Sequence, residues 1–405
     1  MDADRTELPF ADLAIIGAGV VGLGIAWEAA QSGRSVRLID PRPATGATYA
    51  AAGMLAPVSE LHYQEEDLLE LTLASAALYP GFIDSLPGAG ASAGYEKTRT
   101  LVLGADAADR RALEDLRDVQ LQHGLPVDSI AIREARSLEP LLGAHLSCAF
   151  SIDADHQVDP RRLAASLEAA LAAHADREGS PDHLVRQHAA GLIHADPEDS
   201  ESAVTGVELV DGTAVRAAEV VVANGLSAPR LAGLPRSLRL PVRPVHGDIL
   251  RLRVPAHLQP LLTATVRGLV RGVPVYLVPR DDGTVVLGAT QREGGTALVS
   301  AGGVYQLLRD AQVLLPAVAE LELIEATARA RPGTPDNAPL LGRVAGSRGD
   351  DIPGLIIATG FFRHGVLLTP IAARICRRLM DGRADARWHR FRPDRFSDTL
   401  TREST

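Results

Sequence analysis

The stretch DLAIIGAGVVGLGIAWEAAQSGRSVRLID, residues 12–40, decides the fold of the first part of this chain. Residues 13–16 form a short apolar run, which predicts a buried parallel strand, and residues 20–31 have the apolar composition of a helix. Ser32 and Gly33 end this helix, and residues 35–39 predict a second strand that runs into Asp40. The stretch therefore predicts a strand, a helix and a second strand, the unit from which doubly wound α/β domains are built.

Three glycines and one acid in this stretch predict a dinucleotide site. Gly17, Gly19 and Gly22 have the spacing G-x-G-x-x-G. The first permits a tight turn, the second lets a pyrophosphate approach the backbone, and the third lets helix and strand pack closely. The helix that follows presents free N–H groups and the positive end of its dipole to the phosphates. Asp40 lies 18 residues after Gly22, where a carboxylate can hold an adenosine ribose; a glycine-rich packed turn alone would leave it unexplained.

Composition excludes several classes of protein. A chain of 405 residues with 46% hydrophobic residues predicts two lobes and a large core. A net charge of −10 argues against a surface for nucleic acid or anionic membranes. No apolar stretch is long enough to span a bilayer, and the acidic start lacks the features of a signal peptide, so we expect a cytoplasmic protein. Cys148 and Cys376 are too few for a disulfide framework or a metal cluster, and we predict no metal site.

The remainder of the chain changes pattern twice. The small residues 46–53 suit a backbone that lies against a ligand. Residues 241–290 predict short antiparallel strands, which look like an insertion into the first lobe. Residues 355–358 then predict another buried strand, followed by TGFFRHG and a helix over residues 366–380. The pattern predicts that the chain returns to its first lobe at the end.

This layout and its motifs resemble the D-amino-acid-oxidase-type flavoproteins, and most closely the glycine oxidases of thiamine biosynthesis. The resemblance covers nearly the whole length. It rests on GAGVVG with Asp40, AAAGML, VYLVPR, VLGAT, RPGTPDNAPLLG and GFFRHGVLLTP. It implies an α/β fold, α+β overall, in which a Rossmann-like FAD-binding domain carries an inserted, mainly antiparallel β-sheet substrate domain. We assign residues 1–84, 153–238 and 327–405 to the FAD-binding domain, and residues 85–152 and 239–326 to the substrate-binding domain.

The resemblance also implies which residues bind FAD. Besides the glycine motif and Asp40, the implied contacts are Val20, Val21, Ala47, Thr48, Ala52, Gly53, Met54 and Val185. The segment around the isoalloxazine ring comprises Gly360, Phe361, Phe362, Arg363, His364, Gly365, Val366 and Leu367. A helix beginning at the glycine of this segment would stabilise the negative charge of reduced flavin, although it could also be an ordinary helix start after a strand. No cysteine lies in a matching attachment segment, so we predict non-covalent FAD.

Three side chains are implied to bind and orient the substrate. Arg331 matches the arginine that binds the amino-acid carboxylate in the similar oxidases, and a planar guanidinium suits bidentate capture of that group. Tyr276 matches a pocket tyrosine and Arg363 a pocket arginine. Arg329 stands where the family tends to carry a small residue and shares a strand face with Arg331. We expect it to lie outside the pocket, because an uncompensated guanidinium beside Arg331 would be costly to bury.

The reaction implied is oxidative deamination of glycine or small D-amino acids. Hydride transfer from the substrate Cα to flavin gives an imine that hydrolyses to a 2-oxo acid and ammonia, and dioxygen reoxidises the flavin to give hydrogen peroxide. The implied partners are a small amino acid and dioxygen, and relatives form homo-oligomers. A sarcosine or other secondary-amine oxidase, a quinone-linked D-amino-acid dehydrogenase and a flavin-bearing scaffold without oxidase activity remain as alternatives.

Overall fold

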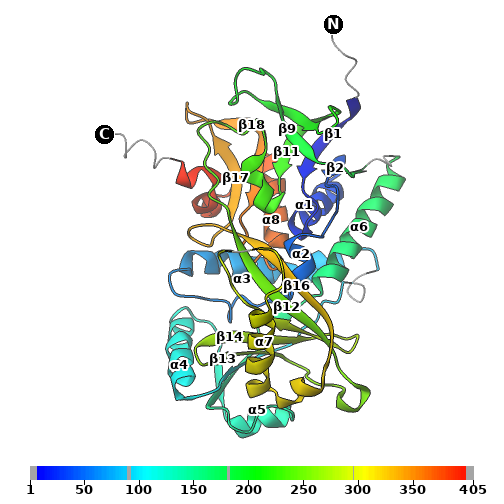
Figure 1. Ribbon diagram of the computed structural model, residues 1–405. Helices are drawn as coiled ribbons and strands as arrows, with labels where there is room; N and C mark the ends of the chain where they lie inside the picture. The colour runs from blue at the N-terminus through cyan, green and yellow to red at the C-terminus, as the bar shows by residue number, and fades with distance from the viewer. Residues whose placement is uncertain (1–6, 89–92, 180–182, 295, 398–405) are drawn as a thin grey trace.

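The computed structural model describes residues 7–88, 93–179, 183–294 and 296–397. The remaining parts of the segments assigned to the two domains, residues 1–6, 89–92, 180–182, 295 and 398–405, lie outside the described residues. The molecule has two lobes, one built on each of two eight-stranded sheets of the described chain (Figure 1). A smaller, two-stranded sheet pairs β3 (Met54–Leu55) with β7 (His156–Gln157). The expected combination of a Rossmann-like domain and a second sheet domain is confirmed.

The first sheet has the order β17-β18-β11-β1-β2-β8, and β9 and β10 extend it beside β11. Its strands are β1 (Glu7–Ile16), β2 (Val36–Ile39), β8 (Leu184–Val185), β9 (Ala189–His194), β10 (Val204–Leu209), β11 (Ala214–Val222), β17 (Leu340–Ala345) and β18 (Asp351–Thr359). The central pairs β2–β1, β1–β11 and β11–β18 are parallel, as the apolar runs predict. Parallel strands read as continuous apolar runs because both faces of such a sheet are buried. The parallel strands therefore end at one edge, where the glycine turn lies.

Helices far apart in sequence pack together against this sheet. They are α1 (Val20–Gln31), α3 (Glu66–Asp84), α6 (Pro160–Arg177) and α8 (Thr369–Met380). Gly24 lets α1 approach α8, since a Cβ there would lie 2.4 Å from Thr369 Cγ2. Asp159 caps α6 by accepting hydrogen bonds from the backbone N–H groups of Arg161 and Arg162. The end of the chain is thereby fixed against its beginning, as the sequence predicts.

The second sheet has the order β16-β12-β15-β14-β13-β4-β6-β5 and is antiparallel except for the pair β4–β13. Its strands are β4 (Thr100–Gly104), β5 (Asp128–Ile130), β6 (Cys148–Ile152), β12 (Arg243–Arg253), β13 (Thr265–Val270), β14 (Val273–Pro279), β15 (Thr284–Gly288) and β16 (Glu322–Gly333). The helices α4 (Ala107–Gln122), α5 (Ile132–Leu138) and α7 (Ala301–Leu314) belong to this lobe (Figure 1). The long strands β12 and β16 pair over their whole length and reach toward the first lobe.

Two details differ from the sequence predictions. The last helix begins at Thr369 rather than at residue 366, because Pro370 has no N–H to donate and fits only the first turn of a helix. Residues 365–368 form turns before it, and Leu368 N donates to His364 O over 2.8 Å. β16 crosses the boundary placed between residues 326 and 327, so the division into domains stays a prediction. Among the described residues, no helix has the length and apolar character needed to cross a membrane.

Candidate active site

A cavity of about 700 Å³ lies between the lobes and is lined by both. It extends from the glycine turn after β1 to the end of β16. The predicted cofactor residues that line it are Gly17, Gly19, Val20, Val21, Asp40, Ala47, Thr48, Ala52, Gly53, Met54 and residues 360–367. Arg331 and Tyr276, the predicted substrate residues, line the same cavity. Folding therefore gathers in one space segments that stand hundreds of positions apart in the sequence.

The glycine turn is held in shape by hydrogen bonds. Ala18 N donates to Asp40 Oδ2 over 2.8 Å, and Val20 N donates to Thr48 Oγ1 over 3.0 Å. Gly17 has φ +103°, which a side chain rarely tolerates, and a Cβ on Gly22 would lie 2.0 Å from Gly17 O. Gly22 thus serves packing, as its place in the motif predicts. These contacts keep the turn open at the start of α1, next to Asp40.

Two of the predicted cofactor residues do not reach the cavity. Gly22 and Val185 are not among the described residues that line it. Gly22 lies beneath the turn, packed on Gly17. Val185 lies behind Asp40, where its carbonyl accepts the Asp40 N–H over 3.1 Å. Both support residues that line the cavity, and their part in cofactor binding stays a prediction.

The segment after β18 forms the opposite wall. Helix α3 fixes it, since Tyr79 Oη donates to Val366 O over 2.8 Å and Ser75 Oγ donates to Leu367 O over 2.6 Å. His364 in this segment is buried, and burial, together with the nearby Arg363 guanidinium, lowers its pKa to about 3. The imidazole is therefore neutral at physiological pH.

The cavity has the properties that FAD requires. Three buried polar atoms that belong to lining residues have no hydrogen-bond partner within the described protein: Asn224 Oδ1, His364 Nε2 and Arg363 Nε. Of these, Arg363 Nε has an ion-pair contact with Glu60. Buried polar groups are normally paired, so a polar ligand is expected to meet them. The end near Asp40 matches the adenosine part, the glycine turn the phosphates, and the segment near His364 the ring. The residues present thus fit FAD.

Arg331 and Tyr276 are placed against two glycines of the second sheet. A Cβ on Gly247 would lie 2.2 Å from an Nη atom of Arg331, and a Cβ on Gly288 would lie 2.3 Å from Tyr276 Oη. The Arg331 guanidinium has one long hydrogen bond, 3.5 Å to the Thr290 carbonyl, and no carboxylate partner among the described residues. Burial raises the pKa of Tyr276 although Arg331 opposes this effect, so the phenol is neutral. A neutral donor and an unpaired cation together can bind a carboxylate.

The sequence did not reveal an ion-pair network in the same chamber. Glu60 pairs with Arg267 of β13 and, over 3.3 Å, with Arg363, which also pairs with Glu65. Burial alone would raise the pKa of Glu60, but the Arg267 and Arg363 guanidiniums outweigh it and hold this pKa well below its usual range. Asn337 completes the network by donating to Glu65 over 2.8 Å. One signal in the sequence was Arg267, the only charged residue of the strand TVRGLV.

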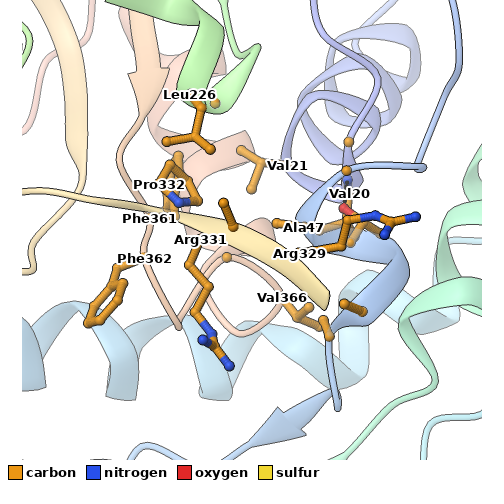
Figure 2. A pocket seen from close by; sticks show the side chains of 18 of the residues that line it. Val20, Val21, Ala47, Leu226, Arg329, Arg331, Pro332, Phe361, Phe362 and Val366 are labelled. Carbon is orange, nitrogen blue, oxygen red and sulfur yellow. Dashed lines mark hydrogen bonds between the residues drawn. The ribbon is translucent and has the colours of Figure 1, made fainter. Parts of the chain in front are cut away.

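The two other predicted arginines differ from expectation. Arg363 lines the cavity, but its guanidinium is held by Glu60 and Glu65 and is not a free carboxylate clamp. The expectation that Arg329 lies outside the pocket is wrong, because Arg329 is among the residues that line the cavity. Its guanidinium nevertheless turns away from Arg331 (Figure 2): it donates to Thr45 O over 3.1 Å and lies over the Tyr49 ring at 5.4 Å. These contacts avoid the repulsion on which the expectation rested.

Neither cysteine is part of this site. Cys148 and Cys376 are buried, and neither is among the described residues that line the cavity. Burial raises the pKa of both thiols, that of Cys376 to about 12. Within the described chain, no group of three His, Cys, Asp or Glu side chains could hold a metal ion.

Comparisons with known proteins agree with this geometry. A glycine oxidase of Geobacillus kaustophilus is 32% identical over 93% of this chain and 94% of its own, and a putative thiamine biosynthesis oxidoreductase, ThiO, of Rhizobium etli is 30% identical over 90% and 95%. The crystal structure of glycine oxidase from Geobacillus kaustophilus matches with a TM-score of 0.82 at 29% identity, covering 96% of this chain and 99% of that one. An iminodiacetate oxidase from Chelativorans matches with a TM-score of 0.80 at 28% identity over 94% and 98%. Residues 12–379 match the DAO family, and the chain belongs to these FAD-dependent oxidoreductases.

Proposed function

We propose that this chain is an FAD-dependent amino acid oxidase that acts on glycine or small D-amino acids. The observation that carries the proposal is the unpaired Arg331 guanidinium, which lies in the cavity that begins at the dinucleotide turn. The similarity to glycine oxidases over nearly the whole chain supports the substrate class. The similarity to ThiO supports a role in thiamine biosynthesis.

The chain's own residues bind and orient the substrate. Arg331 holds the carboxylate through two parallel hydrogen bonds, and the neutral Tyr276 phenol donates a third. The carboxylate is thereby fixed, and the Cα–H bond is directed toward the ring-binding segment at residues 360–367. Catalysis by such positioning needs no general base in the chamber. Glu60 is too weak a base to serve as one, because two guanidiniums hold its pKa low.

Bound FAD would supply the redox chemistry, taking up the hydride of the substrate and returning the electrons to dioxygen to give hydrogen peroxide. The residues of the glycine turn and Asp40 hold its dinucleotide part in this proposal. Non-covalent attachment is part of it, since neither Cys148 nor Cys376 lines the cavity. The two-domain division, the cytoplasmic location and a homo-oligomeric state stay predictions.

A peroxide assay across glycine, sarcosine, D-alanine, D-proline, D-glutamate and iminodiacetate tests the proposal. We expect the highest kcat/KM among glycine, sarcosine and D-alanine. Absence of peroxide with all six, combined with flavin bleaching by glycine under anaerobic conditions, would indicate a dehydrogenase with another acceptor. No bleaching by any of the six would contradict the proposed function.

Oxidation of iminodiacetate is the second candidate. The similarity to the iminodiacetate oxidase supports it, since that match also covers nearly the whole chain. It requires room and positive charge for a second carboxylate. The same assay separates the two candidates by the ratio of kcat/KM for iminodiacetate to that for glycine.

A further inference from the structure

We propose that Glu60 determines substrate specificity by restricting the chamber to substrates with a single carboxylate. The inference deepens the proposed function and rests on it. Glu60 lies in the loop between β3 and α3 and lines the cavity together with the arginines. It touches no part of the reaction in the mechanism above, so its contacts require a separate explanation.

The Arg331 side of the cavity has more guanidiniums than carboxylates. Three guanidiniums, those of Arg267, Arg331 and Arg363, face two carboxylates, those of Glu60 and Glu65. His62 and His364 add no charge, since burial and the Arg363 guanidinium lower the pKa of both imidazoles. Arg329 is not counted, because its guanidinium is directed to Thr45 O. Within this ion-paired set the sum is one positive charge, which a monocarboxylate neutralises. Asp155 also acts on Arg267 electrostatically, but it accepts hydrogen bonds from Val58 N and Ser59 N and is not among the described residues that line the cavity, so it is left out of the set.

The unbalanced positive charge lies on the Arg331 guanidinium. Glu60 accepts from Arg267 and lies 3.3 Å from Arg363 Nε, so a single carboxylate occupies both. Glu65 engages the other end of Arg363. Arg331 is left as the group without a carboxylate partner among the described residues. A substrate carboxylate therefore meets a free cation at Arg331, and a second carboxylate meets cations that are already neutralised.

A substrate with a second carboxylate would bind this chamber at a cost in free energy. Bringing an unpaired negative charge into a buried chamber is expensive, and the nearby Glu60 and Glu65 would repel it. Specificity can thus come from a repulsive group as much as from an attractive one. Without the charge of Glu60, the Arg267 guanidinium would be free to receive that second carboxylate.

The test uses holoenzymes and two carboxylates that are not oxidised, acetate and malonate, with binding read from the perturbation of the flavin spectrum. Wild type should prefer acetate. Glu60→Gln keeps the shape and removes the charge, so the malonate-to-acetate affinity ratio should rise at least about tenfold. In the double variant Glu60→Gln with Arg267→Gln the charge sum is restored, and the ratio should return to near its wild-type value.

Glu219→Gln is the matched control. Glu219 holds Arg343 in a partly buried pair, with Nη–Oε distances of 3.1 and 2.7 Å, and neither residue lines the cavity. Its ratio should equal that of wild type. If Glu60→Gln does not fold, Arg267→Gln alone tests the same count, because it removes the net positive charge and should weaken acetate binding at least about tenfold.

An unchanged ratio in folded, FAD-bound Glu60→Gln would overturn the proposal, and so would a double variant whose ratio rises as far as that of the single variant. Turnover gives an independent reading: Glu60→Gln should shift kcat/KM from glycine toward iminodiacetate by a similar factor. If wild type oxidises no amino acid, the proposed function fails, while the acetate and malonate titrations still decide the role of Glu60.

Discussion

Arg331 combines three properties at the scale of a single residue. It ends the longest strand of the second sheet, it lines the cavity, and it has no carboxylate partner in the described chain. Its neighbours Arg363 and Arg267 are paired. Removing a guanidinium from water without a carboxylate partner costs free energy, and a ligand that brings a carboxylate can offset this cost. This is the physical basis for assigning the substrate carboxylate to Arg331.

Arg331→Met should abolish most activity and leave FAD bound. Truncating a buried, charge-assisted pair costs roughly 2–5 kcal/mol, so kcat/KM for glycine should fall about 30-fold or more. Arg331→Lys should also be impaired, since an ammonium cannot make two parallel hydrogen bonds. Glycolate, which has the carboxylate but no amine, should lose affinity in parallel. Near-normal kcat/KM for Arg331→Met would place the carboxylate clamp elsewhere.

Replacement of Gly247 by alanine should impair substrate binding by displacing the Arg331 guanidinium. An alanine Cβ at this position would lie 2.2 Å from the Arg331 guanidinium, which is the mobile end of a flexible side chain and will move away. Gly247→Ala should therefore fold and bind FAD, yet raise KM for glycine at least about tenfold, because the carboxylate no longer meets two donors. Gly81→Ala, in α3 with no atom within 4 Å of the added Cβ, is the control. Normal KM in Gly247→Ala would contradict the placement of Arg331.

At the scale of elements, the loop that carries Glu60 is tethered to the segment before β7. Asp155 is fully buried there and accepts hydrogen bonds from Val58 N and Ser59 N, both over 3.2 Å. Burial raises the pKa of Asp155 from 3.8 to about 6, and the hydrogen bonds from Ser59 and Val58 oppose it only in part. The position of Glu60 thus depends on a carboxylate that belongs to a different part of the chain.

This pKa predicts a pH dependence of stability. Because the folded-state pKa lies above the unfolded one, the protonated form favours folding, and its contribution is present below about pH 4 and lost as the pH rises through about 6. Between pH 4.5 and 7.5, the free energy of unfolding of wild type should fall by about 2 kcal/mol more than that of Asp155→Asn. Urea unfolding measures it. Asp153→Asn, at a side chain that is 75% exposed, should behave like wild type; equal slopes for Asp155→Asn and wild type would contradict the prediction.

At the scale of the whole molecule, the cavity between the lobes makes FAD part of the fold. Residues of both lobes line the cavity, so FAD that binds the folded chain alone will stabilise it. Both cysteines are buried away from the cavity, and burial raises the pKa of each thiol. A covalent link through cysteine would need a reactive thiolate next to the ring.

We therefore expect acid precipitation to leave the yellow colour in the supernatant. The released chain, refolded without FAD, should unfold at a lower temperature than the holoenzyme, and added FAD should restore the difference. Differential scanning fluorimetry with and without excess FAD measures this. Colour that stays with the precipitated protein would show covalent attachment.

The sequence by itself determined the local units. The run from residue 12 to residue 40 specifies strand, glycine turn, helix and strand, because period, turn residues and helix ends are encoded within a few positions of each other. It also predicted the return of the chain through residues 355–358. The resemblance added Arg331, Tyr276 and the turn at residues 360–367, all of which line the cavity.

Only the tertiary structure decided which charges are free. Glu60 meets Arg267 across 207 positions, and Glu65 meets Arg363 across 298, through packing between elements that no local pattern encodes. The same holds for Gly247, whose missing side chain matters only because Arg331 lies against it. The resemblance pointed to Arg331 and Arg363, and Arg329 was expected outside the pocket. The fold added Arg267, paired Arg267 and Arg363 with carboxylates, directed Arg329 to Thr45 O and left Arg331 to bind. Electrostatic balance depends on distances across the folded chain, and these are set when the lobes pack together.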